Sequence, residues 1–159
     1  MTSGISLDKL KELSNSRQDL FDFIAEHLVT QGEQAAGSTD EHNWTCRYKI
    51  EKDGKTLKCA VGCLIPDSCY SAAFEGDGAR ELIDFFAGFG KEEAVLLRGI
   101  LRDNIKMLVD FQHLHDSKGW IDGHFYKSRL REKLSDIAEK YYLGTDFLDS
   151  LFQSETNPV

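Results

Sequence analysis

Residues 44–63 read WTCRYKIEKDGKTLKCAVGC, and this stretch decides the β part of the fold. Apolar and polar residues alternate from position 44 to position 50, which is the period of a half-buried strand. The alternation resumes at position 56, after Asp53-Gly54, a dipeptide typical of tight hairpin turns. We therefore expect a β-hairpin with strands at 44–50 and 56–63, whose apolar face carries three of the four cysteines.

The register of this hairpin decides how close its cysteines come. A four-residue loop over 51–54 would place Cys46 directly opposite Cys59, with Cβ atoms about 4.5–5.5 Å apart. A two-residue turn would instead place Tyr48 opposite Cys59 and Cys46 opposite Val61. The cysteines share one surface in both registers.

The rest of the chain carries helical patterns. Ser16 stands three residues before Asp19, a capping arrangement, and precedes a helix expected over 17–31. Other helices are expected as one short piece that starts near Ser6 and as longer segments at 79–89, 91–116, 121–142 and 145–152. The predicted fold class is α+β, a mostly helical single domain with four to six helices and one β-hairpin near 44–63. We expect the domain to span 1–153 and residues 154–159 to form a disordered tail.

Composition restricts the function classes. The 159 residues carry 19 basic and 27 acidic side chains, and the resulting net charge of −8 opposes non-specific binding to nucleic acid or to an anionic membrane. No stretch approaches the apolar length of a membrane span, and the first residues do not resemble a signal peptide. We therefore expect a cytoplasmic protein with reduced cysteines and a partner that carries a basic surface.

The cysteines form the most specific chemical pattern. Cys46, Cys59 and Cys63 are candidate zinc ligands, with His115 or Cys69 as the fourth, because zinc prefers thiolate and imidazole ligands. Their spacing differs from that of a zinc knuckle, whose ligands come in close pairs on tight turns. Two alternatives stay open: the cysteines are small core residues, or they form a redox-sensitive pair.

A second candidate cluster lies near the end of the 91–116 helix. Asp110, His113 and Asp116 are three residues apart and could converge on one helix face, which is typical of metal or hydrolase chemistry. His115 falls on the apolar side, so we expect its imidazole to point inward. We expect this helix end to dock on the hairpin with Tyr48, Cys59 and His115 close together, which adds Tyr48 to the cluster. The alternative is that His113 is solvated and that His115 is a buried, hydrogen-bonded core residue.

Several short motifs resemble those of a family of small proteins found in bacteria, phages and prophages. They are Cys46-Arg47-Tyr48, the run KCAVGCLIPD over 58–67, an opening helix over 20–32, and Gln112 with His115-Asp116 at a helix end. The resemblance spans residues 20–142, and the chain departs from it by a segment before residue 16, a tail beyond 142, and Cys69. It implies a cytosolic location and an association with mobile elements, but it implies no reaction and assigns no catalytic residue.

No complete catalytic set can be assembled from the sequence. A protein-protein interaction function is therefore favoured over catalysis, with the acidic surface binding a basic partner. One alternative is a zinc-binding module or a hydrolase that uses the Cys/His cluster. Another is a self-associating structural protein, in which an amphipathic helix seals a homodimer.

Overall fold

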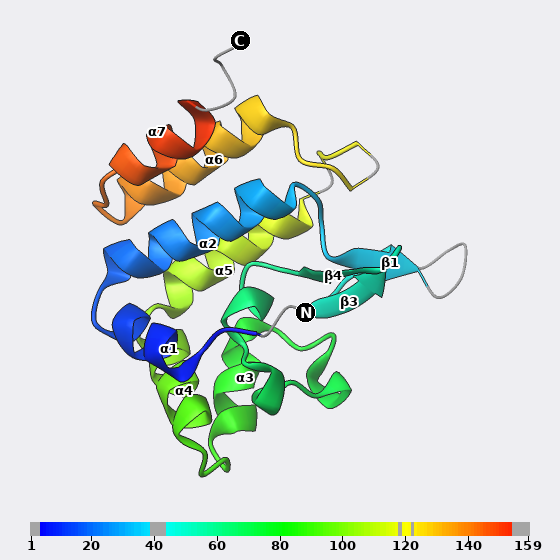
Figure 1. Ribbon diagram of the computed structural model, residues 1–159, viewed down its shortest axis with the longest axis vertical. Helices are drawn as coiled ribbons and strands as arrows, with labels where there is room; N and C mark the ends of the chain where they lie inside the picture. The colour runs from blue at the N-terminus through cyan, green and yellow to red at the C-terminus, as the bar shows by residue number, and fades with distance from the viewer. Residues whose placement is uncertain (1–3, 39–43, 118, 122, 154–159) are drawn as a thin grey trace.

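The computed structural model describes residues 4–38, 44–117, 119–121 and 123–153 (Figure 1). Its described part has two small antiparallel β-sheets and seven α-helices, where four to six were expected. The predicted α+β, mostly helical single-domain fold is confirmed. The proposed tail at 154–159 lies outside the described residues. The helices are α1 (Leu7–Ser14), α2 (Arg17–Gln31), α3 (Ala79–Phe86), α4 (Glu92–Asp103), α5 (Ile105–Asp116), α6 (Lys127–Lys140) and α7 (Asp146–Gln153).

The helices stack in layers (Figure 1). The α6 and α7 pair covers α2 and α5, and α1, α3 and α4 lie on the other side of that middle layer. One core runs through these layers, and its largest fully buried side chains are Phe21, Phe74, Phe86 and Phe111. None of the described helices is both long enough and apolar enough to cross a membrane.

The start of α2 agrees with its capping signal. The Ser16 side chain accepts a hydrogen bond from the Asp19 backbone N–H at 3.1 Å, and the helix runs over the expected 17–31. Its first turn is also tied to the far end of the chain. The Gln18 side-chain amide donates to the Gly144 carbonyl at 3.0 Å and accepts from the Gly144 N–H at 2.7 Å.

The expected helix over 91–116 is two helices, and this part of the prediction was wrong. Asn104 separates α4 from α5 with non-helical backbone angles, and its side chain donates to the Ile100 carbonyl. Arg17 then bonds both the Asn104 side chain and the Asp103 carbonyl. A polar side chain that competes for backbone groups therefore ends α4 inside a continuous apolar pattern.

The β structure differs from the expected single hairpin. Strands β3 (Lys49–Lys52) and β4 (Lys55–Lys58) pair around Asp53-Gly54, with Lys52 opposite Lys55, so the two-residue turn is confirmed. Both turn residues have positive φ, as a type I′ turn requires. Strand β2 (Trp44–Cys46) pairs instead with β1 (Ala36–Ser38), which places Cys46 opposite Ala36 rather than opposite Val61 or Cys59.

The second strand ends earlier than expected because the backbone turns tightly after it. Cys59 N–H donates to the Tyr48 carbonyl at 3.3 Å, which continues the hairpin by one pair. A short 3₁₀ helix then begins at Gly62, and it is followed by two more at Asp67–Cys69 and Ala72–Phe74. A Cβ on Gly62 would lie 2.0 Å from the Tyr48 carbonyl oxygen, so only glycine fits this contact.

Candidate functional site

A polar pocket of about 390 Å³ lies where the β-strands meet α3 and α5. One wall is the 46–48 segment, another is the loop into α3, and the third is the last two turns of α5. Five of the residues predicted from the sequence line it: Cys46, Tyr48, Cys59, His113 and Asp116. The end of α5 therefore lies against the β structure, as expected, and Gln112 bonds the turn after β4, but His115 does not line the pocket with Tyr48 and Cys59.

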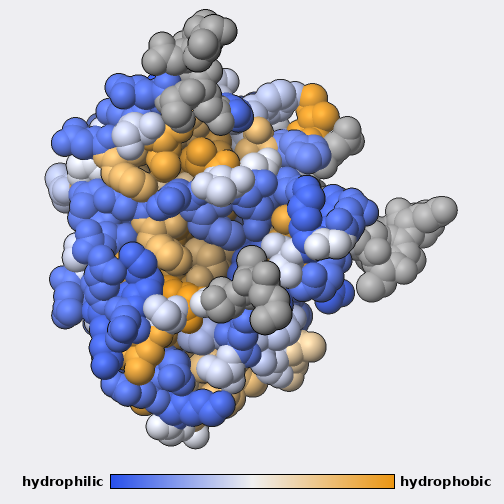
Figure 2. Space-filling view, viewed as in Figure 1, coloured by the Kyte–Doolittle hydropathy of each residue, from blue (hydrophilic) through white to orange (hydrophobic). Residues whose placement is uncertain are grey.

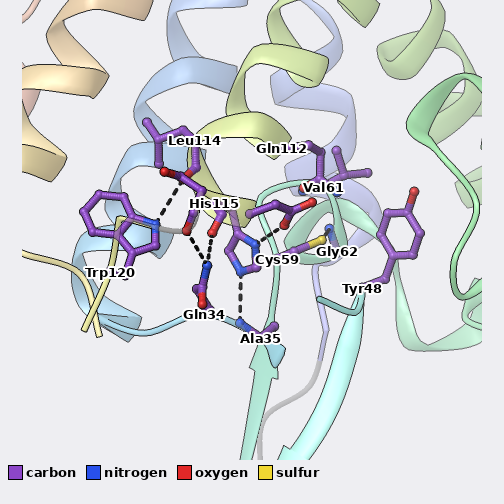
Figure 3. Close-up of polar contacts among 12 residues, drawn as sticks. Gln34, Ala35, Tyr48, Cys59, Val61, Gly62, Gln112, Leu114, His115 and Trp120 are labelled. Atoms are coloured by element: carbon purple, nitrogen blue, oxygen red, sulfur yellow. Dashed lines mark hydrogen bonds and ion pairs between the residues drawn. The ribbon is translucent and has the colours of Figure 1, made fainter. Parts of the chain in front are cut away.

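His115 lies directly behind this pocket and is fully buried. Its Nε2 accepts the Ala35 backbone N–H at 2.9 Å (Figure 3), and its Nδ1 lies 2.6 Å from Asp116 Oδ1. Because an N–H points at Nε2, the ring proton resides on Nδ1, and the neutral imidazole donates it to Asp116. Neither ring nitrogen keeps a free lone pair, so the imidazole cannot act as a general base in this arrangement.

The backbone around His115 is held as firmly as its ring. The Gln34 side chain donates to the His115 carbonyl at 2.7 Å, and Trp120 Nε1 donates to the Leu114 carbonyl at 3.2 Å (Figure 3). The prediction that His115 points inward is confirmed. The Gln34 bond anchors the end of α5 to the segment that leads into β1, and the Trp120 bond anchors it to the segment that follows α5.

Cys46 completes a group with His115 and Asp116. One ligand atom from each of the three lies within 4.8 Å of the others, and the Cys46 thiol hydrogen-bonds to the Asp116 carboxylate. Burial and the nearby Asp116 charge raise the Cys46 pKa to about 12. A thiol with that pKa is protonated at neutral pH, so Cys46 is not an activated nucleophile.

Cys59 faces the same pocket in a different bonding environment. Its Sγ accepts the Gly62 N–H at 3.2 Å, while Gln112 Oε1 accepts the Val61 N–H at 3.1 Å (Figure 3). Burial raises the Cys59 pKa to about 12, although the hydrogen bond from Gly62 opposes this rise. Gln112 therefore joins α5 to the turn after β4, and the only sequence signal for it was its place in the helix-end motif.

The four proposed zinc ligands do not all meet. Within the described residues, Cys46 and His115 group with Asp116, whereas Cys59 and Cys63 belong to no group of three candidate ligands. The Cys63 thiol donates to the Ala60 carbonyl at 3.1 Å, and burial raises its pKa. Cys63 lines a second groove rather than this pocket.

Asp110 lies apart from the rest of its predicted cluster. Its carboxylate accepts hydrogen bonds from Lys140 Nζ at 2.8 Å and from the Tyr141 hydroxyl, so it fastens α5 to α6. Partial burial raises the Asp110 pKa, but these two bonds outweigh it and lower the pKa below the ordinary value. His113 is exposed and lines the pocket with Asp116, three residues further along α5.

The rim of the pocket carries charges that the sequence analysis did not select. Arg47 lies between Cys46 and Tyr48, and Asp77, Arg80 and Glu81 come from the loop and first turn of α3. Tyr48 holds this loop in place, because its hydroxyl donates to the Asp77 carbonyl and its N–H donates to Glu75. Burial strongly raises the Tyr48 pKa, so the phenol stays a hydrogen-bond donor at every physiological pH.

Comparisons with known protein families, with curated proteins and with solved structures found no match.

Proposed function

We propose that the protein acts by protein-protein interaction and that the pocket receives a basic side chain of its partner. The cytosolic location and the association with mobile elements that the resemblance implies belong to the same proposal. The observation that carries this proposal is that Asp116 is oriented, partly exposed and without a cationic partner among the described residues. This carboxylate is fixed in orientation by His115 and Cys46, its side chain is 44% exposed, and no lysine or arginine of the described residues forms an ion pair with it.

The charge of the pocket lining supports a cationic ligand. Asp77, Glu81 and Asp116 contribute three carboxylates, against the guanidinium groups of Arg47 and Arg80. A lysine or arginine that enters from a partner would meet an oriented acceptor without the cost of ordering it first. The two arginines at the rim would then meet carbonyl or carboxylate groups that flank the inserted side chain.

The chemistry of the neighbouring groups supports binding rather than catalysis. Both nitrogens of His115 are engaged in hydrogen bonds, and the thiols of Cys46 and Cys59 hold their protons. A hydrolase or thiol enzyme needs a free base next to its nucleophile. A partner side chain needs only the shape and charge that the pocket offers.

A peptide titration tests this proposal. Acetylated Gly-Arg-Gly amide should shift the backbone amide NMR signals of residues 46–48 and 112–116, and the matching Gly-Glu-Gly peptide should not. The variant Asp116→Asn removes the charge but keeps an oxygen that accepts the His115 Nδ1–H, so we expect it to fold. Its affinity for the arginine peptide should be lower than that of wild type by about fivefold or more. Asp84→Asn is the matched control, because Asp84 is an exposed aspartate outside the pocket lining. Equal binding of the glutamate peptide, or unchanged binding by Asp116→Asn, would refute the proposal.

Zinc binding is the second candidate, and the proximity of Cys46, His115 and Asp116 favours it. The hydrogen bonds count against it, because zinc would have to displace either the Nδ1 proton or the Ala35 N–H from the imidazole. Native mass spectrometry under reducing conditions with added zinc distinguishes the two. A stoichiometric zinc adduct that Cys46→Ser abolishes would replace the interaction proposal with a metal site.

A further inference from the structure

Two arginines of the pocket at Asp116 have no acidic partner among the described residues. Arg47 and Arg80 both line the pocket, and no carboxylate in that part of the chain lies within ion-pair distance of either guanidinium. Four other arginines donate to an oxygen of the protein, and they are Arg17, Arg98, Arg102 and Arg131. Two cationic groups in one pocket are therefore available to a ligand.

The acidic groups of the pocket lie beside these arginines without pairing with them. Arg47 directly follows Cys46, whose thiol hydrogen-bonds to the Asp116 carboxylate. Arg80 directly precedes Glu81 in the first turn of α3. Charges of both signs thus line one pocket, and no ion pair between them neutralises either sign. A ligand that carries both a cation and an anion complements such a lining better than a ligand that carries a cation alone.

This charged lining distinguishes the pocket from the second groove, which runs between α1, α2 and β4. That groove exposes mainly apolar surface, from Ile5, Phe23 and Leu57. Figure 2 shows apolar surface following α2 on the face that α1 and α2 share. The pocket at Asp116 is also the smaller of the two, and its volume of about 390 Å³ lies near the lower limit for sites that hold small molecules. A pocket of this size suits one residue at the end of a chain better than a segment that passes through.

We propose that the basic side chain received by the pocket belongs to the C-terminal residue of the partner, whose free α-carboxylate binds the guanidinium groups of Arg47 and Arg80. This inference rests on the proposed function, because Asp116 still binds the lysine or arginine side chain. The planar fork of a guanidinium matches a carboxylate through two parallel hydrogen bonds. An internal lysine or arginine offers the two guanidinium groups only neutral carbonyls, so a chain end forms charge-assisted bonds that an internal residue lacks.

The test compares two peptides that differ only at the C-terminus. Acetyl-Gly-Arg with a free carboxylate and acetyl-Gly-Arg amide are each titrated into the wild-type protein, and the shifts of the backbone amide NMR signals give the two dissociation constants. We expect the acid to bind more tightly than the amide by about fivefold or more. Acetyl-Gly-Glu with a free carboxylate should not bind, because it lacks the cation that Asp116 requires.

The double variant Arg47→Gln with Arg80→Gln should lose the preference for the acid. We expect it to bind the acid and the amide within about twofold of each other. It should bind the amide at least as tightly as wild type does, because the pocket loses two positive charges, whereas a misfolded protein would lose both peptides. Arg129→Gln is the matched control, since Arg129 is exposed, lies outside the pocket lining and forms no ion pair with the described residues, and it should keep the wild-type preference.

The outcomes separate this inference from the proposed function. Equal binding of the acid and the amide by wild type, or a preference that survives in the double variant, would overturn the inference and leave the proposed function standing. Binding of neither arginine peptide, or equal binding of the glutamate peptide, would overturn both. Free L-arginine carries the same side chain and carboxylate, so tighter binding of L-arginine than of acetyl-Gly-Arg would overturn the assignment to a partner and indicate a free basic amino acid.

Discussion

Replacing Gly62 by alanine should destabilise the protein more than any other single-methyl addition in the described loops. The new Cβ would lie 2.0 Å from the Tyr48 carbonyl oxygen and 2.8 Å from its carbonyl carbon. Because real Cβ atoms essentially never approach closer than 3.0 Å, the two backbone segments must separate by about 1 Å. The bond from Cys59 N–H to the Tyr48 carbonyl, already 3.3 Å long, and the bond from Gly62 N–H to Cys59 Sγ would both be lost.

The expected cost follows from these losses. Two hydrogen bonds at about 1 kcal/mol each, with about 1–3 kcal/mol for forcing a methyl group into a packed contact, give about 3–5 kcal/mol. Urea denaturation of wild type and Gly62→Ala measures this difference in the free energy of unfolding.

Gly99→Ala is the matched control, since it adds the same methyl group in the interior of α4, where no heavy atom lies within 4 Å of the new Cβ. It should stabilise the protein by about 0.5–1 kcal/mol through helix propensity. A Gly62→Ala protein within about 1 kcal/mol of wild type would show that the contact between Gly62 and Tyr48 does not constrain the hairpin.

Three further predictions concern titratable side chains. His115→Leu removes the acceptor of the buried Ala35 N–H and should lower the free energy of unfolding, measured by urea denaturation, by about 2–4 kcal/mol. The control His113→Leu, at an exposed position, should change it by less than about 0.5 kcal/mol. Equal losses in the two variants would contradict the His115 geometry. Burial lowers the His27 pKa from 6.5 to about 4, so the unfolded chain binds a proton more readily than the folded protein does. The contribution of neutral His27 to the free energy of unfolding is therefore fully present above pH 6.5 and is lost as the pH drops towards 4. Urea denaturation at pH 7.5 and pH 5 should show a loss of about 2 kcal/mol that His27→Gln lacks; the same loss in that variant would exclude His27 as its source. Cys46 and Cys59, with pKa values near 12, should react with iodoacetamide at pH 7.5 about three orders of magnitude more slowly than an ordinary thiol. Mass spectrometry of the labelled, folded protein measures this rate. Rapid labelling of either cysteine would contradict the conclusion that burial keeps its thiol protonated.

Local signals in the sequence predicted the elements that local chemistry controls. Asp53-Gly54 identified the turn because few residues tolerate two successive positive φ angles. Ser16 identified the start of α2 because its side chain satisfies an otherwise unpaired N–H. The inward orientation of His115 followed from its position on the apolar stripe of the helix.

The failures arose where a distant partner decides the outcome. The partner strand of β2 is the sequence Ala-Gly-Ser over 36–38, which lacks β-branched or aromatic residues and gives no strand signal. The end of α4 at Asn104 depends on Arg17, which is far away in sequence. Asp110 was assigned to the site because helix spacing allowed it, but Lys140 and Tyr141 direct its carboxylate towards α6.

The candidate pocket could be predicted only in part, because spacing shows which residues share a face and not how their atoms bond. Cys46 and Asp116 were selected from the sequence, yet their direct contact requires the pairing of β2 with β1. Arg80 and Glu81 gave no signal, because charged residues in the first turn of a helix are more often exposed to solvent than part of a binding site.

The bond pair between Gln18 and Gly144 has a consequence for how the chain is made. The helix α2 emerges early from the ribosome, but two of the helices that cover it, α6 and α7, are the last to be synthesised. At about 5–20 residues per second, the ribosome needs roughly 6–24 s to pass from the end of α2 to the end of α7. Throughout that interval part of the apolar face of α2 is uncovered, and the nascent chain is open to chaperones and proteases until the final helix docks.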